Sequence, residues 1–120
     1  LPPESDLESE PMKNTTIGVA ATDAILTTPQ AQKIVMMAHD GLARAIRPAH
    51  TMFDGDTLFC LATGEKKLPD APGAFISPWA QSLIELGHAA ADCVSRAIIH
   101  SVLSTQSVAD MIAFCDLETL

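Results

Sequence analysis

The chain has 120 residues, and 48% of them are hydrophobic, which is enough apolar material for the core of one small domain. Its 15 acidic and 7 basic residues give a formal net charge of −8. We expect no nucleic-acid partner, because phosphate binding requires a basic face. The longest apolar stretch, residues 89–103, is interrupted by polar and charged side chains, so we also expect no membrane span.

Cysteine usage favours a reducing compartment. The three cysteines, Cys60, Cys93 and Cys115, lie in apolar surroundings without metal-ligand spacing, which is typical of buried free thiols. Residues 1–14 have neither the basic start nor the apolar run of a signal peptide. The sequence therefore predicts a cytoplasmic protein with no metal and no cofactor.

The chain opens with residues 1–13, which are rich in proline, glutamate and serine and are predicted to be a disordered linker. A short β-prone run over residues 16–21 predicts a buried strand. Thr28 before Pro29 predicts a helix with a hydroxyl cap and proline at its first position, and Pro48 ends this helix. The apolar face of the helix is predicted to contain Ala31, Ile34, Val35, Ala38, Leu42, Ala45 and Ile46.

A second strand is predicted over residues 57–62 and is closed by Gly64, before a charged surface loop over residues 65–73. Ser77 before Pro78 repeats the hydroxyl-then-proline helix start. A long and largely buried helix follows, with its apolar positions at Leu83, Ile84, Ala90, Ala91, Val94, Ala97, Ile98 and Val102.

The order strand, helix, strand, helix predicts the α/β class, and a short terminal helix is expected over residues 107–115. A sheet of two strands is marginal in water when it stands alone. We therefore expect further strands to come from another chain or from an upstream segment. The chain is predicted to be one piece of a larger α/β unit.

The junction between the tail and the first strand is a candidate catalytic site. If the bond between Asn14 and Thr15 is cut, Thr15 carries a hydroxyl and a free α-amine, a pair that can attack an amide without a histidine. An α-amine has an unperturbed pKa of about 7.7–8.0, which suits a general base at working pH. The alternative is that these threonines simply open a strand, and residue types alone favour that interpretation.

Two carboxylates, Asp54 and Asp56, flank Gly55 just before the second predicted strand. One carboxylate can hold the ammonium or hydroxyl of a nearby threonine while the second orients the first. An ordinary Asp-Gly turn is the alternative, and a calcium loop is disfavoured because the other EF-hand ligands are absent. His50 is close enough in sequence to help shape this loop, whereas His39 is expected to be a helix-face or capping residue.

Three segments together resemble the DmpA-like aminopeptidases, a family of N-terminal nucleophile hydrolases. The segments are residues 14–24 (NTTIGVAATDA), 38–46 (AHDGLARAI) and 50–59 (HTMFDGDTLF). The family includes L-aminopeptidase/D-esterases, β-aminopeptidases and the endo-type 6-aminohexanoate (nylon) oligomer hydrolases. The chain looks like the small β-subunit of such an enzyme, over residues 15–120, preceded by the end of the α-subunit in residues 1–14.

The resemblance implies a precursor that cuts itself between Asn14 and Thr15, with Thr15 as the nucleophile and its amine as the base. Asp56 would contact Thr15, and Asp54 would support Asp56. The two products would stay together in a four-layer α/β/β/α sandwich, in which the larger α-subunit supplies the oxyanion donors and most of the pocket. Such αβ units often assemble into tetramers, and the substrate would be a small amide or oligoamide.

Two other functions stay open. The ornithine acetyltransferases share this architecture, so the same threonine could transfer an acyl group to an amine rather than to water. A non-catalytic assembly module is the other possibility, with the acidic tail as a linker and the long helices as an interface. Residues 1–14 precede Thr15 without a break, and an uncut chain would leave the amine blocked.

Overall fold

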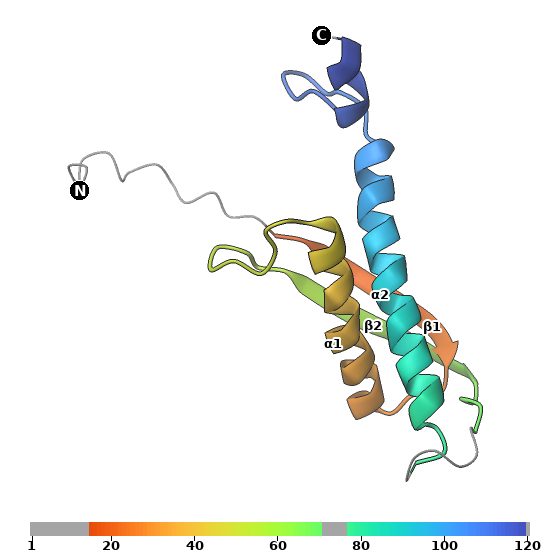
Figure 1. Cartoon of the computed structure of the whole chain (residues 1–120). Helices are drawn as coiled ribbons and strands as arrows, with labels where there is room; N and C mark the ends of the chain where they lie inside the picture. Colours follow the sequence, from red (N-terminus) through yellow and green to blue (C-terminus); the bar gives the residue numbers. More distant parts are fainter. Residues whose placement is uncertain (1–14, 71–76, 120) are drawn as a thin grey trace, which may run out of the picture.

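The computed structural model describes residues 15–70 and 77–119, so the linker predicted over residues 1–13 lies outside the described residues. Two strands and two α-helices alternate along this part of the chain, and a short 3₁₀ helix follows them (Figure 1). The elements are β1 (Ile17–Ala24), α1 (Thr28–Ala45), β2 (Thr57–Lys66), α2 (Ala80–Leu103) and η2 (Phe114–Thr119). The predicted α/β class and the predicted order of elements are confirmed.

The two strands form a parallel pair, and α1 is the crossover between them. Ile17 lies opposite Thr57, so the two strands begin at the same edge of the sheet. In a parallel pair the segments that lead into the strands also meet at that edge. The beginning of β1 is therefore beside the loop that precedes β2.

The far end of the sheet is irregular. Thr22 lies opposite Ala62, but two residues later Ala24 lies opposite Lys66, so β2 contains extra residues at this point. Gly64 lies among them with φ of +77°, a left-handed conformation that glycine adopts without steric cost. The prediction that Gly64 closes the strand is wrong, because Gly64 accommodates a bulge and β2 continues to Lys66.

Both helices cover the same face of the sheet, and the core lies between them and the strands (Figure 1). A Cβ added to Gly41 of α1 would lie 2.2 Å from the carbonyl oxygen of Ala91 on α2. Glycine at this position lets the two helix backbones approach closely. The core consists of Ala38, Leu42 and Leu58, with Val35, Ile46, Ala90, Val94 and Ile98 packed against them.

The opposite face of the sheet is apolar and exposed. Ile17 and Val19 of β1 are 71% and 61% exposed, and Phe59 and Leu61 of β2 are 55% and 58% exposed. The first strand was predicted to be buried, but only the residues that alternate toward the helices are covered. Parallel sheets normally have both faces covered. This uncovered face therefore fits a sheet that is one part of a larger fold.

The two helix starts differ from the predictions by one and by two residues. The cap of α1 is Thr27 rather than Thr28: the Gln30 N–H donates to the Thr27 hydroxyl, and the Gln30 side chain accepts from the Thr27 N–H at 2.8 Å. This reciprocal pair is a capping box. α2 begins after Trp79, and within the described residues no side chain caps its first turn, since Ser77 instead accepts from the Ala80 N–H through its carbonyl.

The second half of α2 is less buried than predicted. Val102 is 45% exposed and Ala97 is exposed as well, and near the start of the helix Ile84 is 48% exposed. The helix extends past the sheet toward the C-terminus, so no described element covers this part of it (Figure 1). The terminal helix predicted over residues 107–115 is also wrong, because Val108 and Met111 close a turn before η2 begins.

The capping box gives a direct test of where α1 begins. Thr27→Ala removes the hydroxyl that accepts from Gln30, and we expect a loss of about 1 kcal/mol in the free energy of unfolding. Thr28→Ala is the matched control, and it should change that free energy by less than about 0.5 kcal/mol because Thr28 is exposed on the first turn. Denaturant titration of both variants measures the difference. A larger loss for Thr28→Ala would instead support Thr28 as the cap.

Candidate functional site

Thr15 lies two residues before β1, and its side chain lies against the turn formed by Asp54, Gly55 and Asp56. A Cβ built on Gly55 would be 2.9 Å from Oγ1 of Thr15 and 3.7 Å from its Cγ2. The absence of a side chain on Gly55 is what permits this approach. Thr15 itself is exposed. The structure thus brings together two features that lie 40 residues apart in the sequence.

Asp56 joins the turn to the start of β1. Its Oδ1 accepts a hydrogen bond of 3.0 Å from the backbone N–H of Thr16, the residue that follows Thr15. The carbonyl of Thr16 in turn accepts from the N–H of Thr57 at 2.8 Å, which begins the parallel ladder. The Asp56 side chain is 9% exposed. A carboxylate with so little access to water depends on its protein partners for stabilisation.

Asp54 shapes the loop that leads to Gly55. Its Oδ2 accepts from the N–H of Thr51 at 2.7 Å, and its own N–H donates to the carbonyl of Thr51 at 3.2 Å. An aspartate that bonds to nearby backbone in this way fixes a turn. Asp54 therefore holds the turn from within, whereas Asp56 connects it to β1.

His50 is the second partner of Asp56. Its Nδ1 lies 3.3 Å from Oδ2 of Asp56, and its ring centroid lies 5.4 Å from that of His39 on α1. The sequence suggested that His50 could shape the loop, but it gave His39 a helix-face role. No spacing rule links residues 39 and 50, because the path of the chain between α1 and β2 decides whether they meet.

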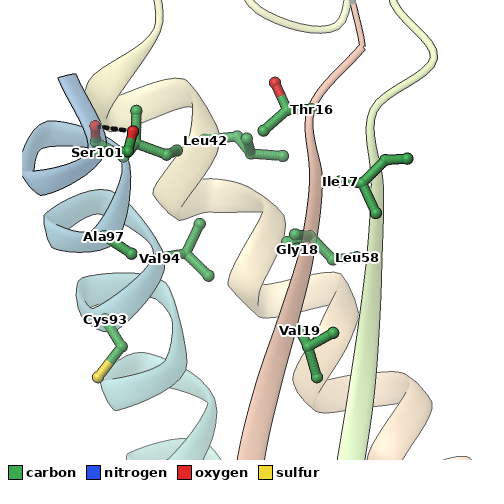
Figure 2. A pocket seen from close by; sticks show the side chains of 11 residues that line it. Thr16, Ile17, Gly18, Val19, Leu42, Leu58, Cys93, Val94, Ala97 and Ser101 are labelled. Carbon is green, nitrogen blue, oxygen red and sulfur yellow. Dashed lines mark hydrogen bonds between the residues drawn. The ribbon is translucent and has the colours of Figure 1, made fainter. Parts of the chain in front are cut away.

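A mostly apolar cavity of about 360 Å³ lies on the helix-covered side of the sheet, between β1 and α2 (Figure 2). Thr16 lines one end of it, next to Thr15, and Ser101 lies on the α2 side, with its hydroxyl donating to the Ile98 carbonyl. No charged side chain is among the described residues that line it. It offers space for an apolar group and no partner for a charged one. The lining residues are Thr16, Ile17, Gly18, Val19, Leu42, Leu58, Cys93, Val94, Ala97, Ile98 and Ser101.

Cysteine chemistry is disfavoured at Cys60. Burial raises the pKa of the Cys60 thiol, which lowers the fraction of reactive thiolate at neutral pH. Cys93 and Cys115 are exposed, contrary to the prediction of buried thiols, because no described element packs over them. Over residues 15–70 and 77–119, no group of three or more histidine, cysteine or acidic side chains could hold a metal ion. In the same ranges no helix is long and apolar enough to cross a bilayer.

Comparison with known proteins gives the family. The sequence profile of peptidase family S58 matches residues 2–112. The chain belongs to peptidase family S58. The resemblance to DmpA-like aminopeptidases is thereby confirmed, since the relatives of this chain include proteins named as an aminopeptidase and as a 6-aminohexanoate-oligomer endohydrolase.

Three relatives illustrate the range. An uncharacterized aminopeptidase of Mycobacterium tuberculosis (strain H37Rv) is 50% identical over 106 residues, which cover 87% of this chain and 31% of the relative. An uncharacterized aminopeptidase of Mycobacterium leprae is 50% identical over 105 residues, covering 85% of this chain and 29% of the relative. A 6-aminohexanoate-oligomer endohydrolase of Paenarthrobacter ureafaciens is 31% identical over 88 residues, covering 73% and 25%. This S58 chain therefore spans about a third or less of the length of these relatives.

The raised pKa of Cys60 leads to a prediction about its pH dependence. A raised pKa shifts thiolate formation to higher pH, so alkylation of Cys60 by iodoacetamide at pH 8 should be slower in the folded protein than in the urea-unfolded protein. The difference should shrink as the pH rises through the folded-state pKa. Mass spectrometry of the Cys60 peptide measures both rates. Equal rates at pH 8 would show that the folded environment does not protect this thiol.

Proposed function

We propose that this chain is the β-subunit region of an autoprocessed N-terminal threonine amide hydrolase, in which Thr15 forms an acyl-enzyme through its hydroxyl oxygen. The observation that carries the proposal is the close approach of the Thr15 side chain to Gly55, where an added Cβ would be 2.9 Å from the Thr15 hydroxyl oxygen. Membership of peptidase family S58 supports the hydrolytic chemistry. The cleavage site is the Asn14–Thr15 bond, of which Asn14 lies outside the described residues.

Self-cleavage would proceed in two steps. The Thr15 hydroxyl oxygen attacks the carbonyl carbon of Asn14, the Asn14–Thr15 amide bond breaks, and the acyl group moves to the oxygen as an ester. Water then hydrolyses the ester, which releases the Asn14 carboxylate and regenerates the hydroxyl. The released α-amine of Thr15 can now act as a general base for that hydroxyl.

Substrate hydrolysis would use the same atoms. The α-amine takes the hydroxyl proton as the oxygen attacks the substrate amide carbon, and the proton then passes to the departing amine. Water hydrolyses the acyl ester to complete the cycle. Asp56 is bound to the N–H of Thr16 and so can fix the backbone that carries the nucleophile, while Asp54 keeps the turn in shape. A fixed nucleophile reacts faster because less positional freedom is lost on the way to the transition state.

The names of the relatives suggest the substrate class. They point to amino-terminal peptide amides, as for the mycobacterial aminopeptidases, or to linear oligoamides, as for the 6-aminohexanoate-oligomer endohydrolases. An acyltransferase of the ornithine acetyltransferase type is the second candidate. It would pass the acyl group to ornithine or glutamate instead of water, and product analysis with both acceptors present separates the two. For a non-catalytic assembly module, Asp56→Asn would alter stability and nothing else.

The uncovered sheet face supports the proposal of a larger partner. Ile17, Val19, Phe59 and Leu61 form an apolar surface on the side away from the helices, and the relatives are about three times as long as this chain. We infer that a larger α-subunit from the same precursor covers this surface and completes the α/β/β/α sandwich. Further assembly into tetramers of αβ units and a cytoplasmic location stay predictions.

The first test is the intact mass of freshly made full-length precursor. We expect it to split into two fragments, the smaller one beginning at Thr15, and we expect amide hydrolysis to develop with the split. Thr15→Ala should abolish both reactions, whereas Thr15→Ser should keep both at a reduced rate because it retains a hydroxyl and an amine. Thr28→Ala is the control, since this exposed threonine begins α1 beyond the opposite end of β1. Full activity in Thr15→Ala would refute the proposed nucleophile.

The second test uses the close approach of Gly55 to Thr15. Gly55→Ala would place a Cβ 2.9 Å from the Thr15 hydroxyl oxygen, so the threonine side chain must turn away. We expect self-cleavage and hydrolysis to slow by about 10- to 100-fold, because misplacement of a reacting group by about an ångström has effects of this size. The exposed position of Gly55 should keep the change in unfolding free energy below about 1 kcal/mol.

Gly64→Ala is the control for Gly55→Ala, because it should lower stability without changing either reaction. No atom lies within 4 Å of a Cβ added there, but φ of +77° makes an alanine strained, so we expect about 1–2 kcal/mol of destabilisation. Both reactions should keep their wild-type rates. Wild-type rates in Gly55→Ala would show that the hydroxyl does not need the geometry described above.

A further inference from the structure

We propose that His50 is a positioning residue for Asp56 and that the ring of His39 braces His50 in this role. The inference rests on the proposed function, since it concerns the carboxylate that holds the backbone behind Thr15. It gives His39 a task that its place on α1 does not reveal from the sequence.

The two carboxylate oxygens of Asp56 have different partners. Oδ1 accepts from the N–H of Thr16, and Oδ2 lies 3.3 Å from Nδ1 of His50. With a proton on Nδ1, the imidazole presents an N–H group to the carboxylate at this distance, in both its neutral and its protonated form. The two partners hold opposite ends of one carboxylate, so removing His50 would leave its rotation less restricted. The Asp56 side chain is 9% exposed, and water can replace the lost donor only in part.

The backbone of His50 has an unusual conformation. Its φ is 60°, in the left-handed region that residues with a Cβ adopt at some cost. This conformation directs the chain so that the imidazole can reach Asp56 six residues later. A strained backbone persists when its surroundings hold it in place. The contacts of the ring with Asp56 and His39 are the interactions that we assign to this task.

The ring of His39 packs beside the ring of His50. Its ring centroid lies 5.4 Å from that of His50 with an interplanar angle of 51°, within the range of packed aromatic pairs. His39 is half-buried on α1, a rigid element, whereas His50 is exposed on a loop with 42% of its side chain accessible. The helix can therefore restrict the motion of a loop residue that would otherwise be free to turn into solvent. The chain of contacts runs from α1 through His39, His50 and Asp56 to the backbone beside Thr15.

The consequence is specific to the chemical step. Asp56 binds the backbone N–H of the residue that follows Thr15, and most of the substrate pocket is expected on the upstream part of the protein. Loss of the His50 contact should therefore lower kcat and the rate of self-cleavage, with little change in KM. A general loss of folded structure would instead lower the amount of active enzyme and leave the kcat per active site unchanged.

The test compares two variants of the full-length precursor that both tolerate the left-handed backbone. His50→Gly has no donor, whereas His50→Asn carries an amide nitrogen at the place of Nδ1 and asparagine is common at positive φ. We expect His50→Gly to slow self-cleavage and kcat by about 10- to 100-fold with KM within about twofold, and His50→Asn to recover most of both rates. His88→Asn is the matched control, because His88 forms another histidine–aspartate pair. Its Nδ1 lies 3.6 Å from Oδ2 of Asp92, and both side chains are exposed on α2. This variant should react at the wild-type rate.

A second pair tests the brace and remains informative if His50→Gly does not fold. His39→Phe keeps an aromatic ring and should retain the wild-type kcat, whereas His39→Ala should lower it without changing KM. Active-site titration corrects every kcat for the fraction of folded enzyme. The proposal is overturned if His50→Gly or His39→Ala retains the wild-type kcat, if the effect falls on KM, or if His50→Asn is as slow as His50→Gly. Wild-type precursor that does not cleave would instead refute the proposed function, which separates the two failures.

Discussion

The parallel pairing of β1 with β2 is the constraint on which the candidate site depends. It places the residue before β1 beside the turn before β2, and the hydrogen bond from the Thr16 N–H to Asp56 fixes that relation. Gly55 then allows the Thr15 side chain to lie against the turn. Sheet register, one carboxylate and one missing side chain together create the arrangement. Together they place the Thr15 side chain against the turn that carries Asp54 and Asp56.

The second theme of the structure is its uncovered apolar surface. One face of the sheet packs on α1 and α2, while Ile17, Val19, Phe59 and Leu61 on the other face remain exposed. The same holds for the end of α2 and the segment after it, where large apolar side chains such as Val108 and Met111 are more than half exposed. Burial of such side chains is a major source of folding free energy. These uncovered surfaces are the ones that we propose the rest of a longer protein covers.

Much of this organisation could be predicted from the sequence, because it depends on local patterns. The apolar spacing of Ile34, Ala38 and Leu42 predicted the buried face of α1, and these residues are indeed buried. Element ends were less predictable, since Thr27 and Thr28 are both competent caps and only the Gln30 contact distinguishes them. The bulge at Gly64 cannot be predicted, because a glycine that closes a strand and a glycine within a bulge look alike in the sequence.

Some residues of the candidate site could be predicted from the sequence, and others could not. Thr15, Asp54 and Asp56 were found from their residue types and from the resemblance to a family with this motif, and their roles stay predictions. The contact between His39 and His50 could not be predicted, because it depends on how the loop returns from α1 to β2. The exposure of Cys93 and Cys115 has another reason: apolar neighbours in the sequence do not guarantee that an element packs over the thiol in space.

The most direct measurement of the central claim is peptide mapping of the mature enzyme, quenched in acid during turnover of a slow amide or ester substrate. We expect an acyl group in ester linkage on the hydroxyl of Thr15, at the N-terminus of the smaller fragment. An acyl group on any other residue, or turnover with Thr15 unmodified and its amine still blocked by Asn14, would contradict it.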